Sequence, residues 1–174
     1  GRIRFLWVMA TNPAASMPDA GLVREALARC PNVVVSDVIA DNDTTLFAHV
    51  RLPALAWGEK DGTVTNSERV ISRQRPFFPP PGEARADWLA LCQVAQRLGH
   101  DAAFAFASPA AVFREYAAMT ALAAERGKVL DLTAHAGLSD AAYDALEPFR
   151  WGGTHPLRTR YPTPSGKARL VPVA

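Results

Sequence analysis

The sequence predicts an α/β fold built on a parallel sheet with flanking helices. Two apolar runs rich in β-branched residues, 3–9 and 33–35, indicate strands buried on both faces. Between them, apolar residues recur at helical spacing, which indicates a strand–helix–strand unit whose strands most simply run parallel. The length of 174 residues corresponds to one ordinary domain or to a piece of a larger protein.

Composition narrows the class of protein. The apolar fraction of 49% and the charged fraction of 21% are typical of a globular domain. A net charge of +2 without a Lys/Arg block argues against nucleic acid as a partner, and no apolar run is long enough for a membrane helix. The chain opens on a strand-like run instead of an initiator Met or a signal peptide, so we expect an internal fragment of a longer protein.

The remaining elements follow from local signals. Ser16 is expected to cap the first helix, which Pro31 ends. Residues 40–49 predict a short helix capped by one of its acids, and residues 50–53 predict a third short strand. Residues 63–65 and 70–75 predict two further strands, the second with outward basic side chains. The proline-rich stretch 76–81 predicts an extended crossing, and three helices are expected to start near Asp87, Ser108 and Ser139.

Polar residues follow the first two strands and predict a common rim. The carboxyl ends of parallel strands meet at one edge of a sheet, so Asn12 and the pair Ser36–Asp37 are expected to share that edge. The stretch 57–69 emerges near the same edge and is dense in hydrogen-bonding groups, with two glycines and Lys60. It suits a polar, anionic, extended ligand, or it is a charged hairpin exposed to solvent.

Cysteine and histidine offer no chemistry of their own. Cys30 and Cys92 fall at apolar helical positions, which predicts buried thiols, and the four histidines have no metal-binding spacing. The sequence also lacks the glycine-rich phosphate loops and the nucleophile elbow. No catalytic residue and no metal ligand are therefore predicted in this chain.

Four ordered motifs carry a resemblance that covers the whole chain. They are Trp7–Pro13, Val34–Asp37, Trp57–Arg69 and Pro81–Trp88. In this order and spacing they resemble the large subunits of the molybdopterin oxidoreductases, the superfamily of dimethyl sulfoxide reductase, formate dehydrogenase and nitrate reductase. Within the superfamily, the sequences of these motifs are most similar to the catalytic subunits of bacterial assimilatory nitrate reductases. One departure is Val70, which stands where the family usually has a second Arg after Arg69.

The resemblance implies a set of cofactor contacts. Asn12, Ser36, Asp37, Lys60 and Asp87 match family positions that contact molybdopterin guanine dinucleotide. The residue types agree, because a carboxylate can accept the paired N–H donors of a guanine edge and a lysine suits a diphosphate. Which aspartate reads the guanine stays open. Without the resemblance, these residues would be read as helix caps, a turn residue and a surface lysine, and we expect Trp57 and Trp88 to be core.

The resemblance also implies a domain plan. Residues 1–56 would be the second half of a Rossmann-like dinucleotide-binding domain, and 57–84 a hairpin and extended crossing of a neighbouring domain. Residues 85–127 would be helices packing on the α/β domain, and 128–174 a tail leading toward a C-terminal barrel domain. The expected fold is thus a partial Rossmann-like parallel sheet with flanking helices, plus a smaller strand-and-loop segment.

The implied function is that of a larger enzyme. The full-length protein would reduce nitrate to nitrite in the cytoplasm, using molybdenum on bis-molybdopterin guanine dinucleotide. Electrons would come from a donor protein or reductase subunit through a 4Fe-4S cluster, whose ligands lie outside this fragment, and neither nucleic acid nor membrane is expected as a partner. The alternatives are a formate dehydrogenase, a non-catalytic relative such as the large iron–sulfur subunit of complex I, and a folded piece that binds nothing alone.

Overall fold

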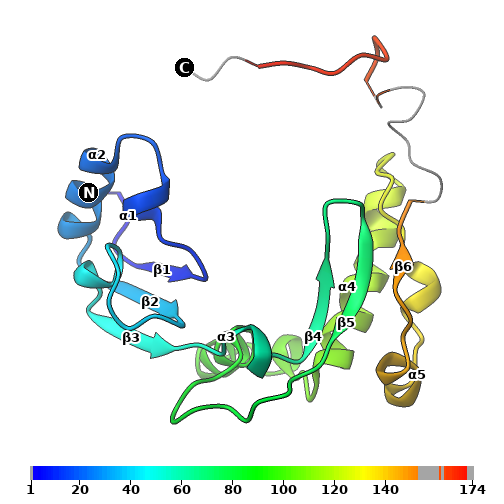
Figure 1. Cartoon of the computed structure of the whole chain (residues 1–174), viewed down its shortest axis with the longest axis horizontal. Coiled ribbons are helices and arrows are strands. Elements are labelled where there is room, and N and C mark those ends of the chain that lie inside the picture. The colour runs from blue at the N-terminus through cyan, green and yellow to red at the C-terminus, as the bar shows by residue number, and fades with distance from the viewer. Residues whose placement is uncertain (1, 153–160, 162, 172–174) are drawn as a thin grey trace. The chain divides into compact units, whose positions relative to one another are not determined.

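The computed structural model describes residues 2–152, 161 and 163–171, and the chain divides into two compact units. The first unit comprises residues 1–60 and 75–106, and the second comprises residues 61–74 and 107–174. Each unit contains one of the two sheets (Figure 1). The domain boundaries expected after residues 56, 84 and 127 stay a prediction.

The first unit is built on a parallel sheet, which confirms the predicted fold class. Strands β1 (Leu6–Met9), β2 (Val33–Asp37) and β3 (Val50–Pro53) run parallel in the order β1-β2-β3 (Figure 1). β1 is shorter than predicted because β2 offers pairing partners only from Val33 onward. Ile3 and Phe5, which precede β1, are exposed.

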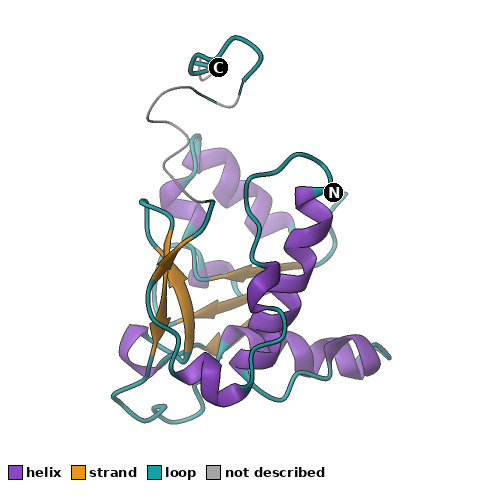
Figure 2. Cartoon of the chain, turned by 90° about the vertical axis from the view of Figure 1, so that its right-hand side faces the viewer, coloured by secondary structure: helices purple, strands orange, loops and turns teal. Residues whose placement is uncertain are grey.

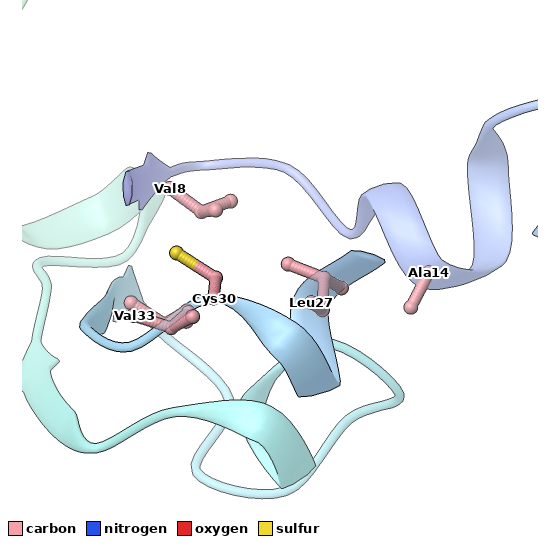
Figure 3. Packing of buried hydrophobic residues seen from close by; sticks show 6 residues of the cluster. Val8, Ala14, Leu27, Cys30 and Val33 are labelled. Carbon is pink, nitrogen blue, oxygen red and sulfur yellow. The ribbon is translucent and has the colours of Figure 1, made fainter. Parts of the chain in front are cut away.

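Helices close one face of this sheet and form its core. α1 (Pro13–Ser16) and α2 (Ala20–Arg29) bring Ala14, Leu27 and the cap residue Cys30 against strand residues such as Val8 and Val33 (Figure 3). Every labelled side chain of this cluster is at most 7% exposed. The prediction that the strands are buried on both faces holds only in part, because Val8, Val33 and Val35 are buried whereas Trp7 and Val34 are half-buried. Cys30 is a buried thiol as predicted, and so is Cys92 in the next helix.

The start of α2 differs from the prediction. Asp19, and not Ser16, caps this helix: its carboxylate accepts a hydrogen bond from Leu22 N at 3.4 Å. Ser16 instead ends the separate short helix α1 and donates its hydroxyl hydrogen to the Asn12 carbonyl at 3.0 Å. Pro13 favours the start of α1, and Met17, in an extended conformation, ends it before α2 begins.

The short helix predicted within residues 40–49 is a single 3-10 turn, η1 (Thr45–Phe47), and no acid caps it. The carboxamide oxygen of Asn42 accepts from Thr44 N and Thr45 N, each at 2.9 Å. A neutral amide serves here because its Nδ2 is needed as a donor to Asp37 at 3.0 Å. An aspartate at position 42 would place two carboxylates in contact.

Helix α3 is anchored beside the end of β3. The 3-10 turn η2 (Trp57–Glu59) follows β3. Residues 76–81 re-enter the first unit without any helix, as predicted, and Arg85 then forms an isolated parallel bridge with Ala54. Arg85 N donates to Pro53 O at 3.1 Å, and its carbonyl accepts from Leu55 N at 3.3 Å. α3 (Asp87–Arg97) and η3 (Ala102–Phe104) follow, so Asp87 begins its helix next to the sheet.

The second unit combines an antiparallel sheet with helices. Strands β4 (Gly62–Thr65), β5 (Val70–Gln74) and β6 (Phe149–Arg150) lie in the order β4-β5-β6, and Figure 2 distinguishes them from the helices. The helical elements are α4 (Pro109–Ala124), η4 (Thr133–His135) and α5 (Asp140–Asp144), with Ser108 and Ser139 capping α4 and α5 as predicted. Across the described part of the chain, no helix is long and apolar enough to cross a membrane.

The prediction of outward basic side chains on β5 is wrong for Arg73. Its side chain is only 3% exposed, because strand alternation places it on the same face as the core residue Ile71. The guanidinium pairs with Asp61 at 2.7 Å and with Asp144 at 3.1 Å, and lies 4.2 Å from the centre of the Tyr143 ring. These partners come from distant positions, so the strand alone could not reveal them.

Candidate functional site

A pocket of about 440 Å³ lies in the first unit, where the parallel strands end. Its walls come from the loops after β1 and β2, from residues 54–60, and from the first residue of α3. Four of the five predicted site residues line this pocket, and each belongs to a different segment: Asn12, Asp37, Lys60 and Asp87. The edge predicted from strand order therefore exists and carries polar side chains.

The pocket wall after β1 has a strained backbone at Ala10 that hydrogen bonds hold in place. Ala10 has a φ of 53°, in the left-handed region that a non-glycine residue rarely adopts, and its N–H donates to Ser36 O at 3.2 Å. Asn12 Oδ1 accepts from the hydroxyl of Thr44 at 2.7 Å, and that hydroxyl oxygen accepts from Ala14 N at 3.1 Å. Thr44 is fully buried, so this network fixes the Asn12 carboxamide.

The wall after β2 is organised by Asn42, a residue that the sequence reasoning missed. Asp37 Oδ1 accepts from Ile39 N at 3.0 Å, and Asp37 Oδ2 accepts from Asn42 Nδ2 at 3.0 Å. Through Thr44, Asn42 also supports the Asn12 wall. The signal that could have revealed Asn42 is the polar run 41–45 in the loop after β2.

Lys60 and Asp87 form the third side of the pocket. Lys60 Nζ lies 3.4 Å from Asp87 Oδ2, and the two side chains are 31% and 25% exposed. The other carboxylate oxygen, Asp87 Oδ1, is buried, and no residue in the described ranges donates a hydrogen bond to it. A buried acceptor left without a donor is unfavourable by about 1–3 kcal/mol, so this wall lacks one hydrogen-bond donor.

Ser36 lies apart from Asn12, Asp37 and Lys60. Its hydroxyl oxygen accepts from Trp7 Nε1 at 2.8 Å, the residue is 2% exposed, and it lines a second pocket of about 300 Å³. Neighbouring strand residues face opposite sides of a sheet, which explains why Ser36 and Asp37 face different pockets. Asp87 lines both pockets.

Trp57 corrects another expectation. It was expected in the core, yet it is 67% exposed and lines the main pocket. It begins a 3-10 turn in the loop after β3, where no helical or strand periodicity fixes which side is buried. Trp88 is half-buried within α3.

The pocket is lined by two carboxylates, two amides and an ammonium group. Such a set accepts paired N–H donors and donates to carbonyl or phosphate oxygens. Among the residues that the structure describes, no cluster of three or more His, Cys, Asp or Glu could hold a metal ion. The arrangement is therefore suited to binding and orienting a polar heterocyclic ligand.

Known proteins match this chain in sequence. The family model of the molybdopterin oxidoreductases matches residues 1–97. A nitrate reductase of Klebsiella oxytoca is 52% identical over 182 residues, which cover 100% of this chain and 21% of the relative. The assimilatory nitrate reductase catalytic subunit of Bacillus subtilis is 36% identical, with 89% of this chain and 20% of the relative covered. The F420-dependent formate dehydrogenase subunit alpha of Methanocaldococcus jannaschii is 39% identical, with 68% and 17% covered.

The matched region coincides with the site. Residues 1–97 make up more than half of the chain. They include the parallel sheet and every residue that lines the main pocket. The chain spans about a fifth of the length of the curated nitrate reductases that it matches. On the strength of this match, the chain belongs to the molybdopterin oxidoreductase family.

Proposed function

We propose that the chain is part of a molybdenum-dependent nitrate reductase catalytic subunit, which reduces nitrate to nitrite. Its own contribution would be part of the binding site for molybdopterin guanine dinucleotide. The similarity to nitrate reductases extends over the whole chain, whereas the similarity to the formate dehydrogenase covers 68% of it, which favours nitrate. The full-length protein would work in the cytoplasm with an electron-donor protein or reductase subunit.

The observation that carries the proposal is the convergence at one pocket. Asn12, Asp37, Lys60 and Asp87 come from separate segments and line the same 440 Å³ space. Charged side chains that gather in a pocket and pair only in part are characteristic of a binding site. Asp37 is bonded to its own loop, while Asp87 keeps one unsatisfied oxygen.

The residues present fit the proposed cofactor. Guanine and pterin both have a ring edge with adjacent N–H donors, which a carboxylate accepts as a pair. Asp87 Oδ1 is a buried acceptor that lacks such a donor among the described residues. Lys60 offers an ammonium group for a carbonyl or phosphate oxygen of the ligand. Asn12 Nδ2 could donate to the ligand as well, since no described residue accepts a hydrogen bond from it.

The chain's own residues would bind and orient, and the reaction would take place elsewhere in the full-length protein. The cofactor would supply the oxygen-atom transfer at molybdenum. Asp87 and Lys60 would hold the ring edge, while Asn12 and Asp37 would fix the adjacent loops against it. We expect the 4Fe-4S cluster to be bound by residues outside this chain, and the isolated chain to be inactive.

The test is to purify the full-length protein and measure three quantities: its molybdenum, its guanine nucleotide and its formation of nitrite. Metal analysis should find molybdenum, and acid hydrolysis should release a guanine nucleotide in proportion to it. Nitrite should form from nitrate with a reduced viologen dye as electron donor. A protein without molybdenum would match the non-catalytic alternative and contradict the proposal.

A formate dehydrogenase-type subunit is the second candidate, because the Methanocaldococcus jannaschii relative is 39% identical. The same purified protein distinguishes the two. Oxidation of formate with an oxidised viologen dye, without nitrate reduction, would favour the second candidate. Both candidates use the pocket in the same way.

A further inference from the structure

We propose that Trp57 is a stacking platform for the flat ring that the main pocket binds, an inference that rests on the proposed function. The ligand class is a bicyclic 2-amino-4-oxopyrimidine, the ring system shared by guanine and pterin. Trp57 is a large aromatic side chain, 67% exposed, on a pocket whose other lining includes two carboxylates, two amides and an ammonium group.

The turn that carries Trp57 is held from its own side. Ala56 N donates to Glu59 Oε2 at 2.7 Å, and Glu59 N donates to Ala56 O at 3.0 Å. These two bonds close the 3-10 turn around Trp57. A ring on a closed turn loses little conformational freedom when a ligand covers it, which favours stacking.

The same turn is also clamped from the returning chain. Gly58 O accepts hydrogen bonds from Phe77 N at 2.9 Å and from Phe78 N at 3.0 Å. The two phenylalanine rings lie against Gly58 so closely that a Cβ there would come within 2.7 Å of the Phe77 ring. The glycine therefore permits a close contact that fixes the backbone next to Trp57.

The neighbouring polar groups determine what can stack. Lys60 follows three residues after Trp57 on the same segment, and Asp87 is its ion-pair partner. A ring held over Trp57 would present its edge to these side chains, with its N–H groups toward Asp87 and its carbonyl toward Lys60. Face contact from an aromatic ring and edge contact from a carboxylate together are the usual way a protein reads a single heterocycle.

The test compares two substitutions in the full-length holoprotein. Trp57→Phe keeps an aromatic face, whereas Trp57→Leu keeps apolar bulk without one. After equal dilution into mild denaturant, molybdenum and guanine nucleotide retained on gel filtration are followed over time. We expect W57L to lose cofactor roughly ten- to hundred-fold faster than wild type and W57F to stay within about threefold of it.

Two further measurements separate the possible outcomes. Phe5→Leu is the matched control, because Phe5 is an aromatic side chain of the same unit that is 58% exposed and does not line the pocket, and this variant should release cofactor like wild type. Apoprotein is also titrated separately with GMP and with a pterin, and the ring that stacks on Trp57 should bind more weakly to W57L but not to W57F.

Equal release by W57L and W57F, or equal affinity of both variants for GMP and for the pterin, would overturn the stacking role. Wild-type protein that carries molybdenum and guanine would still uphold the proposed function in that case. Wild-type protein without cofactor would contradict both.

Discussion

Replacing Asp87 by Asn removes a negative charge from the pocket wall with almost no change in side-chain shape. Asp87 Oδ1 is buried without a donor among the described residues, and Oδ2 lies 3.4 Å from Lys60 Nζ. An asparagine can keep its oxygen toward only one of these two directions, because its other atom is an NH2 group. If the oxygen stays with Lys60, the NH2 group faces the N–H groups of the proposed ring.

The expected magnitude follows from the hydrogen bond that is lost. A hydrogen bond to a charged group contributes about 1.5–3 kcal/mol, which corresponds to roughly 10- to 150-fold faster release of cofactor. The effect on the folded apoprotein should be small. The Lys60–Asp87 pair is 31% and 25% exposed, so its loss should destabilise by about 1 kcal/mol or less.

The assay measures molybdenum and guanine nucleotide retained by D87N during dilution into mild denaturant, together with the Tm of the apoprotein. Asp101→Asn is the matched control, because Asp101 is an exposed acid of the same unit that lines neither pocket described above. D87N that retains cofactor as long as wild type would refute the role of Asp87. An apoprotein Tm lowered by more than about 4 °C would show a structural role instead.

Three further predictions concern stability. Asn42→Ala should destabilise the first unit by about 2–4 kcal/mol, because the backbone N–H groups of Thr44 and Thr45 lose their acceptor. Hydrogen exchange at these two amides should become faster, and unchanged exchange would contradict the prediction. Ala10→Gly should stabilise by about 0.5–1 kcal/mol in denaturant unfolding, because glycine relieves the left-handed φ of 53°, and a loss of stability would contradict the strain. Burial raises the pKa of Tyr143, although Arg73 opposes the shift. The neutral Tyr143 side chain therefore contributes stability that is complete below the ordinary tyrosine pKa of about 10 and is lost as the pH rises through the raised pKa. Tyr143→Phe should remove this alkaline loss of Tm in thermal unfolding, and an unchanged pH profile would exclude Tyr143 as its source.

A fourth prediction concerns the ion-pair network of the second unit. Arg73→Met should destabilise by about 2 kcal/mol, less than a fully buried pair would, because Asp61 and Asp144 are 42% and 71% exposed and can be rehydrated. The matched control is Arg114→Met, whose pair with Asp140 is 29% and 71% exposed and should contribute less than about 1 kcal/mol. Equal losses of unfolding free energy in the two variants would contradict the reasoning from burial.

Much of the first unit could be predicted because its signals are local. The apolar runs that form β1 and β2 mark strands covered by helices, and strand order alone places Asn12 and Asp37 at one edge. Strand alternation also shows that Ser36 must face away from Asp37, although the prediction grouped them. The separation follows from strand alternation, so the sequence alone predicts it.

The remaining features depend on partners that sequence spacing does not reveal. Arg73 is buried because Asp61, Asp144 and Tyr143 meet it from other segments. Asn42 gains its role only once the loops after β1 and β2 lie together. Trp57 is exposed because of the direction of a loop, for which no periodicity exists.

The central claim is that one pocket, lined by four separate segments of this chain, holds part of a molybdopterin guanine dinucleotide. An experimental structure of the full-length protein purified with its cofactor tests it most directly. A guanine or pterin ring edge should lie within hydrogen-bonding distance of the Asp87 carboxylate. Protein side chains from elsewhere in the molecule filling that pocket, with the cofactor bound away from it, would contradict the account.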